Sequence, residues 1–138
     1  MQIPPDVYRK IIYAKKFIDE HFQESINLNA ISRKACISRF HFHRLFTQVY
    51  NKTPHQYLTL KRIDYATDLL KNDEVSVQEI CYRVGFESLG SFSTLFKKKI
   101  GHAPRNFRNR AWFRKEQSRL QPLSQIPHCF IERFQVQH

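Results

Sequence analysis

The chain has 138 residues, of which 41% are apolar and 14% aromatic, so it can bury a packed core and does not belong to the disordered class. Only three glycines and six prolines are present, too few turn signals for a barrel or sandwich of many short strands, which favours a helical protein. Lys and Arg number 23 against 12 Asp and Glu, and the net charge of +11 predicts a polyanionic partner. A solvated surface that only keeps a small protein soluble is the alternative.

The sequence carries few signs of an enzyme, a metal site or a membrane segment. Three cysteines, Cys36, Cys81 and Cys129, lie far apart, so neither a disulfide framework nor a zinc site is predicted. Cys36 and Cys81 fall within apolar helical patterns and are interpreted as small buried residues. We expect no catalytic residue and no cofactor, because no catalytic triad or glycine-rich phosphate loop has a supporting signature. No apolar run is long enough for a membrane span, and a cytoplasmic location is expected.

Helical periodicity begins close to the N-terminus. Apolar residues recur every three or four positions over residues 7–22, which predicts a first helix of about four turns that starts near Asp6. A short helix is expected after Asn27 and another after Ser38, because both residue types cap helix N-termini. A short turn at Cys36 separates these two helices. The arrangement is typical of a helix-turn-helix unit.

A long linking helix follows, and then the first pattern returns. Thr53 and Pro54 place a capping hydroxyl before a proline at the first helical position, and the helix should end near Asn72. Residues 26–37 resemble the residues 49 positions further on, and residues 42–57 resemble those 50 positions further on. Such self-similarity indicates a duplicated unit with one residue inserted after the second turn.

The predicted fold is therefore all-α, with two helix-turn-helix units joined by a long linking helix. The domain should cover residues 6–111, with units at about 6–53 and 72–111 and the linking helix at 54–71. Residues 112–138 are predicted to be a C-terminal tail of unknown role. It could be a strand packed on the body, a partner-binding extension or the stub of a further domain.

The second unit carries a dense signature. Its residues are Ile80, Cys81, Val84, Gly85, Phe86, Ser88, Phe92, Phe96, Lys97, Gly101, Pro104, Phe107 and Arg108. Together with the linking-helix pattern that starts Arg62-Ile63, and with Ser38, Arg44 and Phe46, they resemble the DNA-binding domain of the AraC/XylS family of bacterial transcription regulators. The resemblance covers about residues 6–110.

This resemblance implies a domain of seven helices that sets two recognition helices into successive major-groove segments and recruits RNA polymerase. Only five residues precede the first predicted helix, so the chain resembles the short, stress-response type without an upstream sensor. Cys36 stands where the family commonly has glycine. A non-glycine residue at positive φ is therefore expected there, at a cost of about 1 kcal/mol.

The first recognition helix is predicted to turn polar and aromatic side chains toward DNA bases. Helical spacing places Phe42 and Phe46 inward and exposes the opposite rows. The candidate base-facing residues are Arg39, Phe40, His43, Arg44 and Thr47. Arginine can bond guanine through two contacts, histidine can bond guanine N7 or O6, and Phe40 can contact a thymine methyl. Alternatively, Arg39 contacts phosphate and Phe40 is a partly exposed core residue.

The second recognition helix offers weaker base contacts. Its candidates are Ser91, Ser93 and Thr94, short side chains that discriminate poorly between bases. Residues 97–119 form a basic segment with nine Lys and Arg and a single acid. The candidate phosphate contacts are Thr53, Lys97, Lys98 and Arg105, at helix N-termini or in this basic segment. We therefore expect the first unit to supply most of the discrimination.

The predicted function is a sequence-specific regulator that binds double-stranded DNA as a monomer, because both recognition helices lie in one chain. A non-specific architectural DNA-binding protein is the alternative. The chain could also be the DNA-binding part of a larger sensor or repair protein, although the reactive cysteine cluster of such repair domains is missing.

Overall fold

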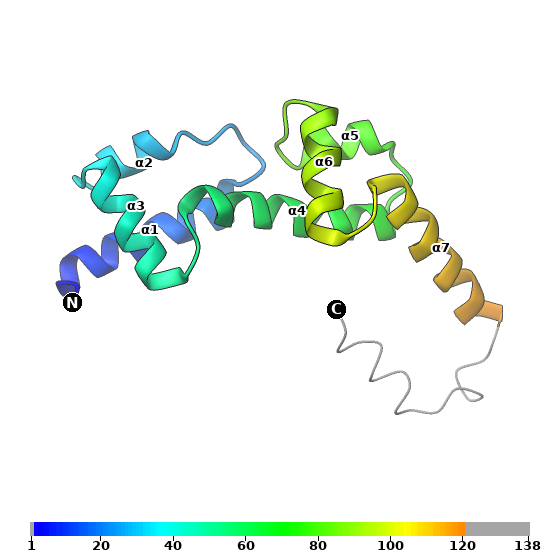
Figure 1. Cartoon of the computed structure of the whole chain (residues 1–138), viewed down its shortest axis with the longest axis horizontal. Coiled ribbons are helices and arrows are strands. Elements are labelled where there is room, and N and C mark those ends of the chain that lie inside the picture. Colours follow the sequence, from blue (N-terminus) through cyan, green and yellow to red (C-terminus); the bar gives the residue numbers. More distant parts are fainter. Residues whose placement is uncertain (1, 121–138) are drawn as a thin grey trace.

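The computed structural model describes residues 2–120, and the regular structure in that range is helical. The helices are α1 (Pro5–His21), α2 (Leu28–Lys34), α3 (Arg39–Tyr50), α4 (Pro54–Asn72), α5 (Val77–Arg83), α6 (Leu89–Ile100) and α7 (Pro104–Leu120) (Figure 1). The all-α prediction is confirmed for these residues. The predicted linking helix is α4, which ends at Asn72 as expected.

Polar side chains define where the short helices begin. The Asn27 side chain accepts hydrogen bonds from the backbone N–H groups of Asn29 and Ala30, at 3.0 and 3.3 Å. The Ser38 hydroxyl accepts one from His41 N–H at 3.2 Å. These contacts satisfy backbone donors that the first turn of a helix leaves without a partner, and they confirm both predicted caps.

The two helix-turn-helix units have matching helices. Helices α2 and α5 have seven residues each, and α3 and α6 have twelve each. Leu28 and Val77, which begin α2 and α5, are 49 positions apart, whereas Arg39 and Leu89, which begin α3 and α6, are 50 apart. The extra residue in the second turn is Glu87.

The turn residues confirm one expectation about Cys36 and correct another. Cys36 has a φ of 57°, and the equivalent Gly85 has a φ of 109°, so both occupy the left-handed region. Cys36 is nevertheless exposed, and its interpretation as a buried residue is wrong. The left-handed backbone takes the chain out of α2 and moves the thiol off the apolar face. Cys81 is fully buried, and this burial raises the pKa of its thiol. Cys129 lies outside the described residues.

Two hydrophobic cores share α4. The first lies among α1, α2, α3 and the start of α4, and its buried members are Ile11, Ala14, Ile18, Ile31, Phe42, Leu45, Phe46 and Leu58. The second lies among the rest of α4, α5 and α6, with Ile63, Ala66, Leu70, Ile80, Cys81, Val84, Phe92 and Phe96 buried. The boundary between the cores therefore falls on α4 between Leu58 and Ile63.

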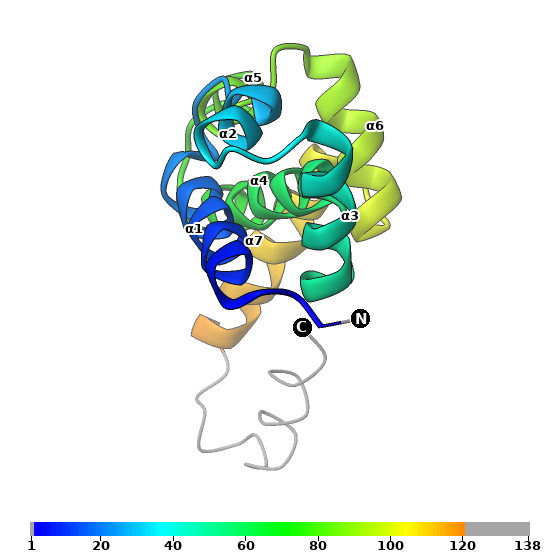
Figure 2. The same ribbon diagram turned by 90° about the vertical axis from the view of Figure 1, so that its left-hand side faces the viewer.

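The two units lie at opposite ends of α4 and face the same way. Figure 1 shows α3 and α6 both running from the top of the view towards the bottom, with α6 in front of α4 and α3 beside the beginning of α4. In Figure 2, turned by 90°, both helices lie on the same side of the molecule, opposite α1, α2 and α5. One face of the protein therefore carries both predicted recognition helices.

Helix α7 packs its first half on α4 and then extends beyond it (Figure 1). It ends at Leu120, so the predicted start of the tail at residue 112 falls within a helix. The apolar pattern fades there because α7 leaves the core and its side chains become exposed. Residues 121–138, to which the remaining expectations for the tail apply, lie outside the described residues.

Candidate nucleic-acid interface

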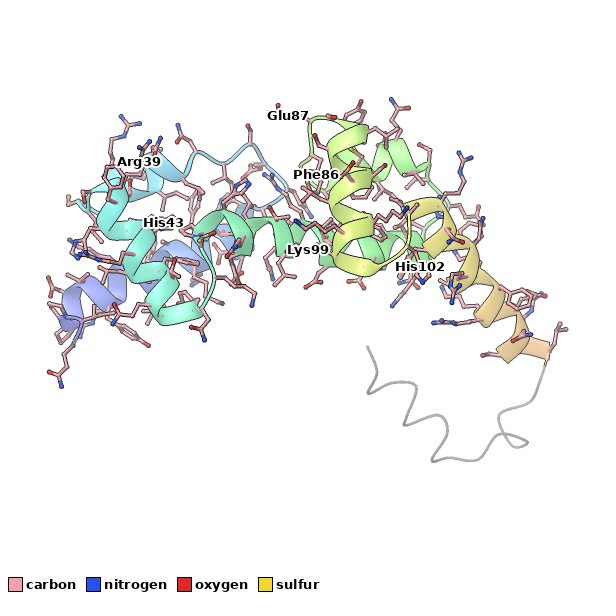
Figure 3. The ribbon with its side chains drawn as sticks, in the orientation of Figure 1. Arg39, His43, Phe86, Glu87, Lys99 and His102 are labelled. Carbon is pink, nitrogen blue, oxygen red and sulfur yellow. The ribbon has the colours of Figure 1, made fainter. Side chains whose placement is uncertain are left out.

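Helix α3 presents a basic and aromatic surface on the shared face. Its inner side buries Phe42, Leu45 and Phe46. The opposite side exposes four of the five residues predicted to face bases: Arg39, Phe40, His43 and Arg44. Figure 3 shows Arg39 near the beginning of α3 and His43 one turn further on. The four exposed candidates thus lie in the N-terminal half of α3, on the side away from the core.

Arg39 and Phe40 form a cation–π pair at the beginning of α3. The guanidinium carbon of Arg39 lies 5.2 Å from the centroid of the Phe40 ring. Phe40 is 78% exposed, which does not fit its alternative interpretation as a core residue. An exposed ring beside a guanidinium can contact a thymine methyl while the guanidinium bonds a guanine or a phosphate.

Thr47 is more constrained than the other candidates on α3. It is half-buried, and its hydroxyl donates a hydrogen bond to the carbonyl of His43 at 2.8 Å. The hydroxyl hydrogen is therefore engaged within the helix, and only the oxygen remains to accept a further bond. Thr47 could accept from an adenine or cytosine amino group, but it could not at the same time donate to guanine.

Helix α6 has a shallow surface where α3 has long side chains. Ser91 and Thr94 are exposed, whereas Ser93 is half-buried and less able to reach a base. Gly90, Ser91, Thr94 and Leu95 line an open hollow on this helix. Leu95, one turn before Lys99 on the same helix, is half-buried. Small side chains permit a close approach of the helix backbone to DNA, but they give few directional contacts.

The last turn of α6 concentrates positive charge. Lys97 and Lys98, the two predicted phosphate contacts, are exposed, and so is Lys99, which was not among the predicted site residues. Figure 3 labels Lys99 on this helix. Lysines in this position also interact favourably with the negative end of the helix dipole, so their charge has a structural role even without DNA.

The N-terminus of α4 is already well capped. Thr53 Oγ1 accepts from Gln56 N–H at 3.1 Å, and Thr53 N–H donates to Gln56 Oε1 at 3.0 Å, which is a capping box. A phosphate near Thr53 would therefore have to use its hydroxyl hydrogen or the amide of His55. Arg105, the other predicted phosphate contact near a helix N-terminus, is exposed in the first turn of α7.

Neither recognition helix contains a carboxylate, and the acidic residue next to them in the chain is Glu87, in the turn before α6. Residues 25–63 and 88–115 contain no Asp or Glu. Within residues 2–120, the acidic side chains belong to α1 and the loop after it, the second half of α4, the segment around α5, and the end of α7. The surface of α3 and α6 is thus suited to a polyanion, because neither helix carries a negative charge that would repel the phosphates.

Not every basic residue of the sequence contributes to this surface. Arg108, within the basic segment 97–119, is only 8% exposed. Its guanidinium donates to the carbonyls of Leu70 and Asp73 at 3.3 and 3.1 Å. From the sequence alone, the charge of Arg108 adds to the net charge of +11 like that of any exposed arginine. The alignment of Arg108 with the inward-facing Leu58 of the first unit, 50 positions earlier, was the available signal that it is buried.

Residues 2–120 contain neither a membrane-spanning helix nor a cluster of metal-binding side chains. No helix in that range is long and apolar enough to span a bilayer. Among the same residues, no group of three or more His, Cys, Asp or Glu could hold a metal ion.

Comparison with known proteins shows what the chain is similar to. Residues 31–110 match the family described as a helix-turn-helix domain. The HTH-type transcriptional activator RhaS of Escherichia coli O139:H28 is 35% identical over 92 residues, which cover 67% of this chain and 33% of RhaS. The chain therefore spans about a third of the length of this relative.

Solved structures show the same fold. The DNA-binding domain of AdpA, a global transcriptional factor solved with a target DNA, matches with a TM-score of 0.74 and 27% identity, over 78% of this chain and 97% of that one. The C-terminal domain of AraT, a response regulator from Geobacillus stearothermophilus, matches with a TM-score of 0.68 and 29% identity, over 79% and 88% of the two chains.

Proposed function

The chain belongs to the AraC/XylS family of transcription regulators, and we propose that it is a sequence-specific DNA-binding regulator that inserts α3 and α6 into successive major-groove segments. The observation that carries this proposal is the position of both helices on one face, with the same direction and no carboxylate on either. Successive major-groove segments on one side of B-DNA lie about 34 Å apart, so one chain could occupy two of them.

Helices α3 and α6 have different roles in the proposed recognition of DNA. Arg39, His43 and Arg44 on α3 can make directional or two-point contacts with bases. Ser91 and Thr94 on α6 cannot reach far, so this helix positions the protein through phosphates and DNA shape. Lys97, Lys98, Arg105 and Thr53 supply the phosphate contacts. Base discrimination therefore resides mostly under α3.

The proposed regulator acts as a monomer on an asymmetric site, because one chain supplies both recognition helices. It binds double-stranded DNA and contacts RNA polymerase through a surface that DNA leaves uncovered. RhaS is named a transcriptional activator and AdpA a global transcriptional factor, and regulation without an enzymatic step fits both.

Selection of bound sequences from a random DNA pool tests this proposal. We expect an enriched motif with two blocks whose centres are about 10 base pairs apart, of which only one is sharply defined. Repeating the selection with the Arg44→Ala protein assigns the blocks, because only the block under α3 should lose information. A pool with no enriched motif would instead support a non-specific architectural protein, which the short side chains of α6 favour. Greater information under α6 would contradict the division of recognition.

A further inference from the structure

The geometry between the two units depends on more than α4. The two cores meet on α4 between Leu58 and Ile63, and Arg62 lies at this boundary. Its Nε donates to the carbonyl of Phe22 at 2.7 Å, and its second guanidinium nitrogen donates to the carbonyl of Glu24 at 2.9 Å. Arg62 thus ties the end of α1, in the first unit, to the middle of α4.

The second unit packs directly on this contact. A Cβ at Gly85 would lie 2.7 Å from Arg62 Nε and 2.8 Å from the Phe22 carbonyl oxygen, so only a glycine fits at this distance. The Arg62 guanidinium also lies 5.9 Å from the Phe86 ring centroid. The turn between α5 and α6 therefore packs directly against Arg62 and the Phe22 carbonyl.

Two further contacts reinforce the junction. The Phe22 ring, which packs on the first core, meets Tyr65, which packs on the second, edge to face at 5.7 Å between centroids. Glu87 is the extra residue of the second turn, and Figure 3 labels it at the turn before α6. Burial lowers the pKa of Arg62, and the Glu87 carboxylate acts in the opposite direction. The inserted residue thus lies where its charge acts on Arg62.

We propose that Arg62 is a positioning residue for DNA recognition: by joining the end of α1, α4 and the Gly85 turn, it fixes the relative position of α3 and α6 and so selects the spacing between the two halves of a DNA site. This inference rests on the proposed two-helix binding to DNA. A shift of one base pair moves a half-site by about 3.4 Å along the axis and turns it by about 35°, which a rigid junction cannot follow.

The test compares affinities for the selected site with affinities for the same site lengthened or shortened by one base pair, at one salt concentration. The wild-type protein should prefer the selected spacing by at least about tenfold, within the range of specific over altered sites. Arg62→Met removes both hydrogen-bond donors but keeps an apolar side chain. It should reduce this preference to about threefold or less, because the two units can then shift relative to each other.

Matched controls separate positioning from stability. Arg108→Met also removes an arginine that binds two backbone carbonyls. Those carbonyls belong to the end of α4 and the residue after it, beside the second core and away from the boundary between the cores, so spacing preference should stay within about twofold of wild type. Gly85→Ala and Gly101→Ala both place alanine at a positive φ, 109° and 97°, yet nothing lies within 4 Å of the Cβ at Gly101. Only Gly85→Ala should weaken the spacing preference.

Urea titration of each variant identifies those that are folded, and Gly85→Ala decides the test if Arg62→Met unfolds. If Arg62→Met and Gly85→Ala lose the same affinity at every spacing, the proposal is overturned. A wild-type protein with sequence preference but no spacing preference would overturn it while leaving the proposed function intact. A wild-type protein with neither preference would contradict the proposed function itself.

Discussion

Arg44 is exposed on α3 one residue after His43, on a helix whose inner side is filled by three core residues. Its side chain is long enough to reach a base edge when α3 lies in a major groove, and a two-point contact with guanine contributes about 1 to 3 kcal/mol of discrimination. Exposure alone does not separate this role from a phosphate contact. Loss of a phosphate contact weakens binding to any DNA, whereas loss of a base contact weakens binding to the selected site alone.

Arg44→Ala should weaken binding to the selected site by about 1 to 3 kcal/mol and hardly change binding to random DNA. Mobility-shift titrations on both DNAs measure this difference. Lys97→Ala is the control, since it should weaken binding to both DNAs equally and reduce the salt slope by about 0.9. Equal losses for Arg44→Ala on both DNAs would reassign Arg44 to a phosphate.

Cys36→Gly should stabilise the protein by about 1 kcal/mol, because glycine adopts a left-handed backbone without steric cost. The residue has a φ of 57° and an exposed side chain, so no core contact is lost. Urea unfolding measures the gain. Asn51→Gly, at a φ of 59°, is the control and should gain less, because asparagine tolerates this region better. A destabilised Cys36→Gly protein would show that the thiol makes a favourable contact.

At the scale of elements, α1 is held to α4 by an ionic cluster around Asp19. The Tyr57 hydroxyl donates to one carboxylate oxygen of Asp19, and Lys15 contacts the other at 2.9 Å. Lys61 lies 3.6 Å from the carboxylate. Burial favours the neutral acid, but the hydrogen bonds from Tyr57 and Lys15 outweigh it and lower the pKa of Asp19 from 3.8.

A lowered pKa in the folded state means that Asp19 stabilises the fold above its ordinary pKa of 3.8 and loses this effect as the pH falls through the folded-state value. Asp19→Asn should therefore cost about 1 to 2 kcal/mol at pH 7 and progressively less below about pH 4. Urea unfolding as a function of pH measures both. Glu20→Gln, exposed on the same helix, should cost less than about 0.5 kcal/mol. An Asp19→Asn deficit that is constant with pH would contradict this role.

At the scale of the whole molecule, the proposed DNA contacts all lie between Arg39 and Arg105. Helices α3 and α6, the start of α4 and the start of α7 carry all the proposed contacts, and α7 ends at Leu120. A chain ending at Gln121 should therefore fold and keep its affinity for the selected site within about twofold, since it retains every proposed phosphate and base contact. Mobility shift and circular dichroism test this. A folded truncated chain that binds tenfold more weakly would place part of the interface in residues 122–138.

The internal repeat was the most informative feature of the sequence. Because the same spacing of apolar residues occurs twice, the repeat predicted both helix-turn-helix units and the inserted residue. The caps at Asn27, Ser38 and Thr53 followed from residue type and position. Cys36 was misjudged because its neighbours are apolar, and periodicity alone does not show that the backbone leaves the helix at that residue. The base-facing assignments on both helices remain predictions.

By itself, the sequence determined most of the local structure: where the capped helices begin, which faces are apolar, and that two similar units flank a long helix. These depend on interactions between residues a few positions apart, which the order of residues encodes directly. Only the tertiary structure decided that α3 and α6 share one face, that Arg108 is buried against backbone carbonyls, and that Arg62 joins the end of α1 to the Gly85 turn. These contacts join groups 23 to 40 positions apart, and their geometry depends on how the two cores pack on α4.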